Sequence, residues 1–356
     1  MTFLSLKLIY VTLYPEKYPR IEKIRNAIKD RKDVVFQVLV PKVRIKLGNK
    51  KYERVVSALI NYTCYIAQIL FTKADFYWVT TSPDIFVLPI ILKGNNYILE
   101  YRNPSGLETE MEFGKIGILA EYMEKIALKH SEAISLTTST LAKRVEAFQK
   151  KVFVIPNYPQ KKTFKNTVSA EEFRAIHGVK RNEKIVLFVG RLSKSEGFDI
   201  LPGMIKELSK LKEKVIFWII GDGPLRSIAT GLEKEYPENV KFFGWQPYKE
   251  IPNFINSADV CIAPRPQTPT SDYCNEEGIH KISEYMFYRK PIVACGISQS
   301  KEYLLVRQED MAKGILEALK GKAPRPSPRS WEDDCVGKVL EVIRFAEATK
   351  KIIKPH

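Results

Sequence analysis

The sequence is poor in residues that bind metals or form disulfides. Its 356 residues include only four histidines and five cysteines, and no two cysteines have a CxxC spacing. An odd number of widely separated cysteines favours a reduced, cytoplasmic setting without a cysteine zinc site. No DxD sequence and no His/Asp cluster with ligand spacing is present. We therefore expect no catalytic metal and no bound cofactor.

The sequence also lacks low-complexity segments and a cleavage signal. The first ten residues contain a short apolar stretch, but no small-residue cleavage site follows, so we interpret them as a first strand and not a signal peptide. With 45% apolar residues and no biased segments, a compact globular protein is expected. A chain of this length can form two domains, each with its own core.

No apolar run is long enough for a clear membrane span. The uncharged run Val55 to Phe71 is shorter than the roughly 20 residues that a span needs. This pattern favours a buried core helix and leaves a peripheral membrane contact through residues 42–71 as an alternative. The basic residues that precede the run are Lys42, Arg44, Lys46, Lys50, Lys51 and Arg54.

Positive charge is abundant, with a formal net charge of +16. A field of that sign attracts nucleotides, nucleic acids or an anionic membrane face. No recognisable nucleic-acid-binding motif accompanies the charge, so we expect no nucleic-acid partner.

Short apolar strands alternate with helical patterns along the whole chain, which predicts parallel sheets covered by helices on both faces. The predicted strands are 7–13, 34–40, 75–79, 96–99, 133–136, 152–155, 185–189, 215–220, 240–243, 260–263 and 292–294. The predicted helices are 21–29, 52–71, 116–129, 140–150, 170–177 and 335–350.

Two doubly wound, Rossmann-like domains in series are the simplest architecture. We expect an acceptor-side domain over residues 1–160, a linker over 161–183 and a second domain over 184–330, with a C-terminal helix over 331–356 that packs back toward the first domain. Ligands of such sheets bind beyond the carboxyl ends of the strands.

Several motifs fall at such strand ends. Gly190-Arg191 follows the strand predicted at 185–189, and Gly221-Asp222-Gly223-Pro224 follows the next strand along the chain. Glu276 and Glu284 then stand eight residues apart. Carboxylates in this position can accept hydrogen bonds from sugar and ribose hydroxyls, while an arginine and helix-start amides can meet phosphate oxygens. The order of these motifs indicates a nucleotide-sugar site.

These motifs resemble the retaining GT-B glycosyltransferases, specifically glycosyltransferase family 4 (group 1). The resemblance is strongest over 185–294, moderate over 96–157 and weak over the first ninety residues. It is carried by the segments 188–192 (FVGRL), 220–224 (IGDGP), 242–245 (FFGW), 257–260 (SADV), 280–286 (HKISEYM) and 290–294 (KPIVA), with 154–157 (VIPN) and 330–332 (SWE).

The resemblance implies a GT-B fold, with a nucleoside-diphosphate sugar held mainly by the second domain. The catalytic residues that it implies are Arg191, Lys194 and Glu276. The donor-binding residues that it implies are Gly190, Arg191, Gly221, Gly244, Trp245, Glu277, Gly278, Ile279, Lys281 and Glu284. On the acceptor side it implies Arg102 and Asn103.

Two departures from the family pattern stand out. A lysine usually precedes the glycine after the Gly-Arg turn, whereas Glu196 precedes Gly197 here and the lysine is Lys194. Asn103 stands where an aspartate is common. Glu196 therefore predicts weaker diphosphate binding unless it turns away or Lys194 substitutes.

The implied reaction is transfer of a hexose, with retention of configuration, to a hydroxyl of a glycan acceptor. We expect that acceptor to be lipid-linked at the cytoplasmic membrane face. Two alternatives remain open: an epimerase or sugar-phosphate-forming enzyme on the same fold, and a catalytically silent, membrane-associated scaffold.

Overall fold

The computed structural model describes residues 5–17, 19–81, 83–210 and 214–353. The chain divides into two compact units, one comprising residues 1–156 with 334–356 and the other residues 157–333. The segment 161–183, expected as a linker, lies inside unit 2. The C-terminal segment from Asp334 onward lies inside unit 1.

Within the described residues, unit 1 is built on a six-stranded parallel sheet of order β2-β1-β3-β4-β5-β6. Its strands are β1 (Leu6–Val11), β2 (Val34–Leu39), β3 (Phe76–Thr80), β4 (Tyr97–Tyr101), β5 (Ala133–Leu136) and β6 (Lys151–Val154). Its helices are α1 (Pro19–Ile28), α2 (Lys51–Phe71), α3 (Leu88–Leu92), α4 (Ser105–Phe113), α5 (Ile116–His130), α6 (Ala142–Val145) and α14 (Val336–Ile353).

Unit 2 repeats this plan with a sheet of order β12-β11-β10-β7-β8-β9, also parallel throughout its described strands. Its strands are β7 (Lys184–Val189), β8 (Val215–Ile220), β9 (Val240–Gly244), β10 (Val260–Pro264), β11 (Ile292–Cys295) and β12 (Leu304–Leu305). Its helices are α7 (Ala170–Ile176), α8 (Leu201–Leu208), α9 (Arg226–Glu235), α10 (Ile251–Ser257), α11 (His280–Phe287) and α12 (Met311–Leu319), and α13 (Trp331–Asp334) leads out of it.

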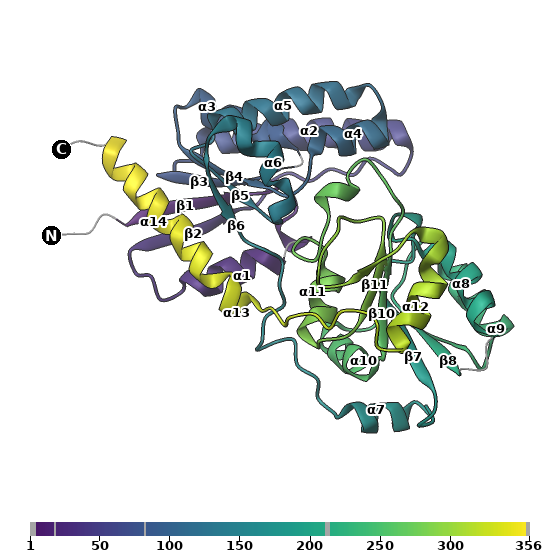
Figure 1. The fold of residues 1–356 in the computed structure, drawn as a ribbon. Coiled ribbons are helices and arrows are strands. Elements are labelled where there is room, and N and C mark those ends of the chain that lie inside the picture. Colours follow the sequence, from purple (N-terminus) through teal and green to yellow (C-terminus); the bar gives the residue numbers. More distant parts are fainter. Residues whose placement is uncertain (1–4, 18, 82, 211–213, 354–356) are drawn as a thin grey trace. The chain divides into compact units, whose positions relative to one another are not determined.

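The unit 2 sheet is buried on both faces, as its nearly continuous apolar strands require. Val186 and Phe188 belong to the core beneath α8, α9 and α12, whereas Ile185 and Leu187 belong to the core beneath α7, α10 and α11. Figure 1 shows these helix groups on opposite sides of the sheet. The period-2 alternation of side chains along β7 therefore supplies both cores.

Two predicted helices differ from expectation. Residues 140–150 form only the short α6, flanked by single turns of 3-10 helix, and the last turn ends at Gln149 with φ +51°. The helix predicted at 52–71 is present as α2, but only 22% of an 18-residue apolar window within Tyr52–Phe71 is buried. The expectation of a buried core helix is therefore wrong.

Candidate active site

The order of the unit 2 sheet reverses direction next to β7. From β7 the chain proceeds outward through β8 and β9, and then returns to place β10 on the other side of β7. This reversal between β7 and β10 is the topological switch point, where open α/β sheets bind ligands at the carboxyl ends of their strands. The residues that follow these two strands are Gly190-Arg191 and Arg265.

Glycines allow the turns beside the switch point to approach closely. The Gly190 amide donates to Ile220 O (3.0 Å), and the Gly221 amide donates to Gly244 O (2.8 Å). A Cβ at Gly221, whose φ is +135°, would lie 1.8 Å from Gly190 O. The structure therefore assigns Gly221 a packing role between turns, while the neighbouring Arg191 side chain is exposed.

A buried ion pair lies next to the Gly190 turn. Lys281 Nζ is 2.7 Å from Glu196 Oε2 and 4.5 Å from the centroid of the Phe188 ring. Burial lowers the pKa of Lys281, although Glu196 acts in the opposite direction. Burial also opposes ionisation of Glu196, but Lys281 and Arg265 outweigh it and hold its pKa below the ordinary value. Lys194, in the same turn as Glu196, is exposed.

The loop before α11 is organised by Asn275, which is buried. Its side-chain Oδ1 accepts from the Glu277 amide (3.0 Å), and its carbonyl accepts from the amides of Gly278 (3.2 Å) and Ile279 (3.0 Å). These three amides, expected to face phosphate, are thus occupied within the loop. The loop is also tied to Asn157, whose amide donates to Glu277 O (2.8 Å).

The Glu276 carboxylate belongs to the same loop. Its Oε1 accepts from Ser300 Oγ (2.9 Å), while its buried Oε2 accepts no hydrogen bond from the described residues. Burial raises the pKa of Glu276, and the neighbouring carboxylates Glu277 and Glu302 act in the same direction. A buried carboxylate oxygen without a protein donor is suited to accept a hydrogen bond from a ligand hydroxyl.

Glu284 lies on α11 and is 8% exposed. The Tyr248 hydroxyl hydrogen-bonds to it, and burial together with that carboxylate raises the pKa of Tyr248. Tyr248 and Trp245, which is 69% exposed, come from the same loop after β9. The loop after β9 and the middle of α11 therefore meet at Glu284.

Tyr248 and Arg265 were not predicted from the sequence. Both follow the carboxyl end of a strand, which is the signal that could have found them. Both lie within the region of strongest resemblance, 185–294, but outside the motif segments that carry it.

On the acceptor side, Arg102 belongs to a buried charge network at the carboxyl end of β4. Glu100, which is fully buried, accepts from Arg102 Nε (2.8 Å) and from the Tyr10 hydroxyl (3.0 Å), and it pairs with Arg20 Nε (3.2 Å). Burial opposes ionisation of Glu100, but the two arginines hold its pKa below the ordinary value.

Asn103 lies beside this network. It accepts from Thr81 Oγ1 (3.4 Å), and its side-chain amide donates to Glu108. Arg102 and Asn103 thus make contacts within unit 1, and their predicted role toward an acceptor stays a prediction.

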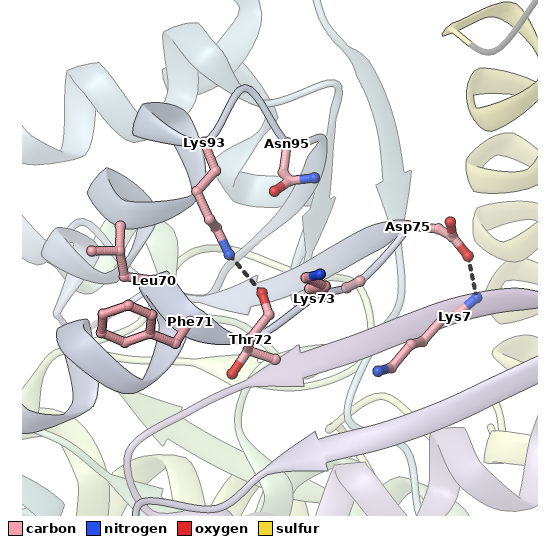
Figure 2. A pocket seen from close by; sticks show the side chains of 9 residues that line it. Lys7, Leu70, Phe71, Thr72, Lys73, Asp75, Lys93 and Asn95 are labelled. Carbon is pink, nitrogen blue, oxygen red and sulfur yellow. Dashed lines mark hydrogen bonds between the residues drawn. The ribbon is translucent and has the colours of Figure 1, made fainter.

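A shallow depression of about 520 Å³ lies elsewhere in unit 1 (Figure 2). Its lining includes Lys7, Asp75 and Asn95, at the amino ends of the strands, and Lys93 donates there to Thr72 O (2.8 Å). Since ligands of these sheets bind at the carboxyl ends, this depression is not the candidate site. Among the described residues, no group of three or more His, Cys, Asp or Glu side chains could hold a metal ion.

Residues 169–325 match the family model "Glycosyl transferases group 1". A protein described as an uncharacterized 41.2 kDa protein in the cps region of Klebsiella pneumoniae is 40% identical over 85 residues. That match spans 24% of this chain and 22% of the Klebsiella protein.

Solved structures of the same fold cover nearly the whole chain. Sucrose-phosphate synthase from Thermosynechococcus elongatus has a TM-score of 0.66 at 14% identity, covering 97% of this chain and 98% of that one. Anabaena HepE in complex with UDP-glucose has a TM-score of 0.60 at 14% identity, covering 97% and 99%. The lipopolysaccharide outer core galactosyltransferase WaaB has a TM-score of 0.55 at 13% identity, covering 97% and 98%. Most of the carboxyl-terminal unit, residues 169–325, is therefore similar to the group 1 glycosyltransferases, and the chain has the two-domain GT-B fold of these solved structures.

Proposed function

We propose that this protein transfers a hexose from a nucleoside-diphosphate sugar to a hydroxyl of a glycan acceptor, with retention of configuration. The observation that carries the proposal is the convergence at one sheet edge of the Gly190-Arg191 turn, Lys281 and Glu284. A relative of the same fold is described with UDP-glucose bound, and another is described as a galactosyltransferase.

Each group at this edge suits one part of such a donor. Glu284, buried and already accepting from Tyr248, can accept from ribose hydroxyls with its remaining lone pairs. The exposed ring of Trp245 offers an apolar face to a base. Arg191 presents a planar fork of donors that fits two phosphate oxygens better than an ammonium does.

The chemistry asked of these residues is positioning and charge stabilisation. The bond between the anomeric carbon and the diphosphate oxygen breaks, and a bond from that carbon to the acceptor oxygen forms on the same face. The acceptor hydroxyl proton passes to the departing phosphate. Arg191, Lys194 and Lys281 would stabilise the charge that develops on the diphosphate. Glu276 would hold a sugar hydroxyl through its unpaired Oε2.

The acceptor we propose is lipid-linked, because α2 buries polar side chains and exposes apolar ones, which is the reverse of an ordinary surface helix. Three polar side chains face inward: Ser57, Asn61 and Tyr65 are buried. Six large apolar or aromatic side chains of the helix are exposed: Tyr52 (62%), Val55 (46%), Val56 (41%), Leu59 (61%), Leu70 (39%) and Phe71 (84%). An exposed apolar stripe of this length fits a helix lying in the plane of a membrane interface.

The inward side chains of α2 also fix the basic segment beside it. Asn61 accepts from the Ile45 amide (2.7 Å), Ser57 accepts from the Leu47 amide (3.0 Å), and Gln68 accepts from the Lys42 amide (3.0 Å). The cations of this segment are Lys42, Arg44, Lys46 and Lys50. Basic residues beside an apolar stripe complement an anionic lipid surface, which supports a location at the cytoplasmic face of the cell membrane.

The donor assignment is tested by calorimetric titration with UDP, GDP and ADP, repeated on Glu284→Ala. We expect one diphosphate to bind and its affinity to fall at least tenfold in the variant, which is about 1.4 kcal/mol. Glu250→Ala, which removes a half-buried carboxylate that accepts from Asn253 in the loop after β9, serves as a control and should bind as the parent does. No binding of any of the three would refute the catalytic proposal and favour a scaffold.

Turnover distinguishes a transferase from an epimerase on this fold. A transferase should consume the matching nucleotide sugar faster when a lipid-linked acceptor is added. Interconversion of sugars without an acceptor would instead support the epimerase.

A further inference from the structure

The ion pair between Glu196 and Lys281 joins two separate elements at the switch point. Glu196 ends the single 3-10 turn Lys194–Glu196 that follows β7, and Lys281 is the second residue of α11. Their side chains are 23% and 9% exposed, and the charged atoms are 2.7 Å apart. Removing either partner of an ion pair this deeply buried leaves the other as an unpaired buried charge, which is strongly destabilising.

Two contacts and the absence of a side chain at Gly190 fix the Lys281 ammonium at the strand end. Besides Glu196, it lies 4.5 Å from the centre of the Phe188 ring. A Cβ at Gly190 would lie 3.0 Å from Lys281 Nζ, so the missing side chain of Gly190 makes room for the amine. The ammonium therefore lies directly against the turn that carries Arg191.

The charges around this ammonium come from two further elements and from α11 itself. Arg265, after β10, disfavours the charged form of Lys281, whereas Glu196 and, more weakly, Glu284 favour it. Without Glu196, burial and Arg265 would both drive Lys281 toward its neutral form. Glu196 is thus the main group that keeps a positive charge at this position.

Resting on the proposed donor site, we propose that Glu196 is a positioning residue for the donor diphosphate. It holds Lys281 charged and aimed at the Gly190-Arg191 turn, and Lys281 in turn contacts the phosphate. The resemblance led us to expect a lysine directly before Gly197. Glu196 stands there instead, and the positive charge is supplied by Lys281 on α11.

The pair gives Glu196 an effect opposite to the one its charge alone suggests. As an isolated carboxylate near a diphosphate, Glu196 would weaken binding, and its removal would tighten it. As the counter-ion of a buried lysine, its removal discharges or releases that lysine and weakens binding. The two possibilities predict changes of opposite sign.

The test is a double-mutant cycle on the full chain, with calorimetric titration of the nucleoside diphosphate that binds the parent and of its nucleoside. The variants are Glu196→Gln, Lys281→Met and the two combined. We expect each single variant to lose at least about tenfold in diphosphate affinity while nucleoside affinity changes by less than about twofold. The combined variant should bind no worse than either single one, because the pair acts as a unit.

Controls separate this inference from the donor assignment. Glu317→Gln with Lys322→Met removes a surface ion pair of the same unit (2.6 Å) and should leave both affinities unchanged. If the parent binds no diphosphate, the proposed function fails first. If the parent binds but Glu196→Gln binds equally well or more tightly, or if the two losses simply add, the positioning role is refuted.

The pH dependence of binding gives a second readout. In Glu196→Gln, diphosphate affinity should decline at a lower pH than in the parent, because Lys281 then keeps the weaker favourable charge of Glu284 and still faces Arg265. Identical pH profiles in the two proteins would contradict the inference.

Discussion

Glycines show how a single residue can determine the candidate site. Gly221 lies against Gly190 O with a φ of +135°, so any side chain there strains the backbone and separates the two turns. A Cβ added to Gly231, on α9, would have no atom within 4 Å. Gly231 is therefore a glycine without this steric constraint.

We expect Gly221→Ala to destabilise the protein by about 2–4 kcal/mol, because a clash with backbone cannot be relieved by a side-chain rotation. Gly231→Ala should instead stabilise it by up to about 1 kcal/mol, as is usual for glycine in a helix. Urea unfolding of both variants measures the difference. Equal stabilities would show that the turns can separate without cost.

A buried carboxyl in unit 1 predicts a pH effect on stability. Burial raises the pKa of Asp84 from 3.8 to about 7, and the nearby Glu124 adds to the rise. A raised folded-state pKa means that the folded protein holds the proton longer than the unfolded chain does. The stabilising contribution of this proton is complete below pH 3.8 and is lost as the pH rises to about 7.

Asp84→Asn should remove this decline, which can amount to at most about 1.4 kcal/mol per pH unit. The measurement is the free energy of unfolding from urea titrations between about pH 4 and about pH 7. A slope against pH that is the same in parent and variant would contradict the assignment.

At the scale of elements, α2 sets the clearest prediction. Leu59→Glu with Phe71→Glu should reduce binding to vesicles containing about one-third phosphatidylglycerol by at least tenfold, because each apolar side chain contributes about 1.5–3 kcal/mol when buried in lipid. Ile176→Glu, which changes an equally exposed apolar residue (65%) on α7, is the matched control. Sedimentation with vesicles gives both values.

Strands were more predictable than helices. Each predicted strand is present, because these strands are short apolar runs bounded by polar turns, and most of them are buried on both faces. The helix α4 gave no such signal, since only Ser105 and Gly106 are buried in it. It packs on α5 through glycines: a Cβ at Gly106 would lie 2.7 Å from Glu121 Cβ. Helices that pack closely through glycines do not need a periodic pattern of apolar residues, so the sequence gives no signal for α4.

Side-chain partners at the site were beyond sequence reasoning. The expected residues Gly190, Arg191, Lys281 and Glu284 do gather at one sheet edge, because parallel strands place their carboxyl ends together. The ion pair of Lys281 with Glu196 depends on how α11 packs against the turn after β7. The orientation of α2 likewise depends on backbone groups of residues 40–47, which accept and donate the hydrogen bonds of its polar face.

At the scale of the whole molecule, the chain enters unit 2 after Pro156 and leaves it before Asp334. The returning helix α14 completes the unit 1 core with Val339, Val342, Ile343 and Ala346, each 0% exposed. It also carries ion pairs from Glu347 to Arg31 (2.5 Å) and from Lys350 to Asp75 (2.9 Å).

Val342→Asp should therefore destabilise unit 1 by several kcal/mol, because it buries an unpaired charge, while the nucleotide affinity of unit 2 stays unchanged. The exposed neighbour Glu341→Ala is the control. Unfolding monitored together with diphosphate titration tests both statements, and a parallel loss of nucleotide binding would show that the units depend on each other.

The return of α14 also fixes an order of events during synthesis. Unit 2 is continuous in sequence, so every strand of its sheet is synthesised before α14. Unit 1 is synthesised first, yet the last side chains of its core are translated at the other end of the chain. The segments of unit 2 are therefore all made before unit 1 receives α14, so the core of unit 1 is the one that is completed last.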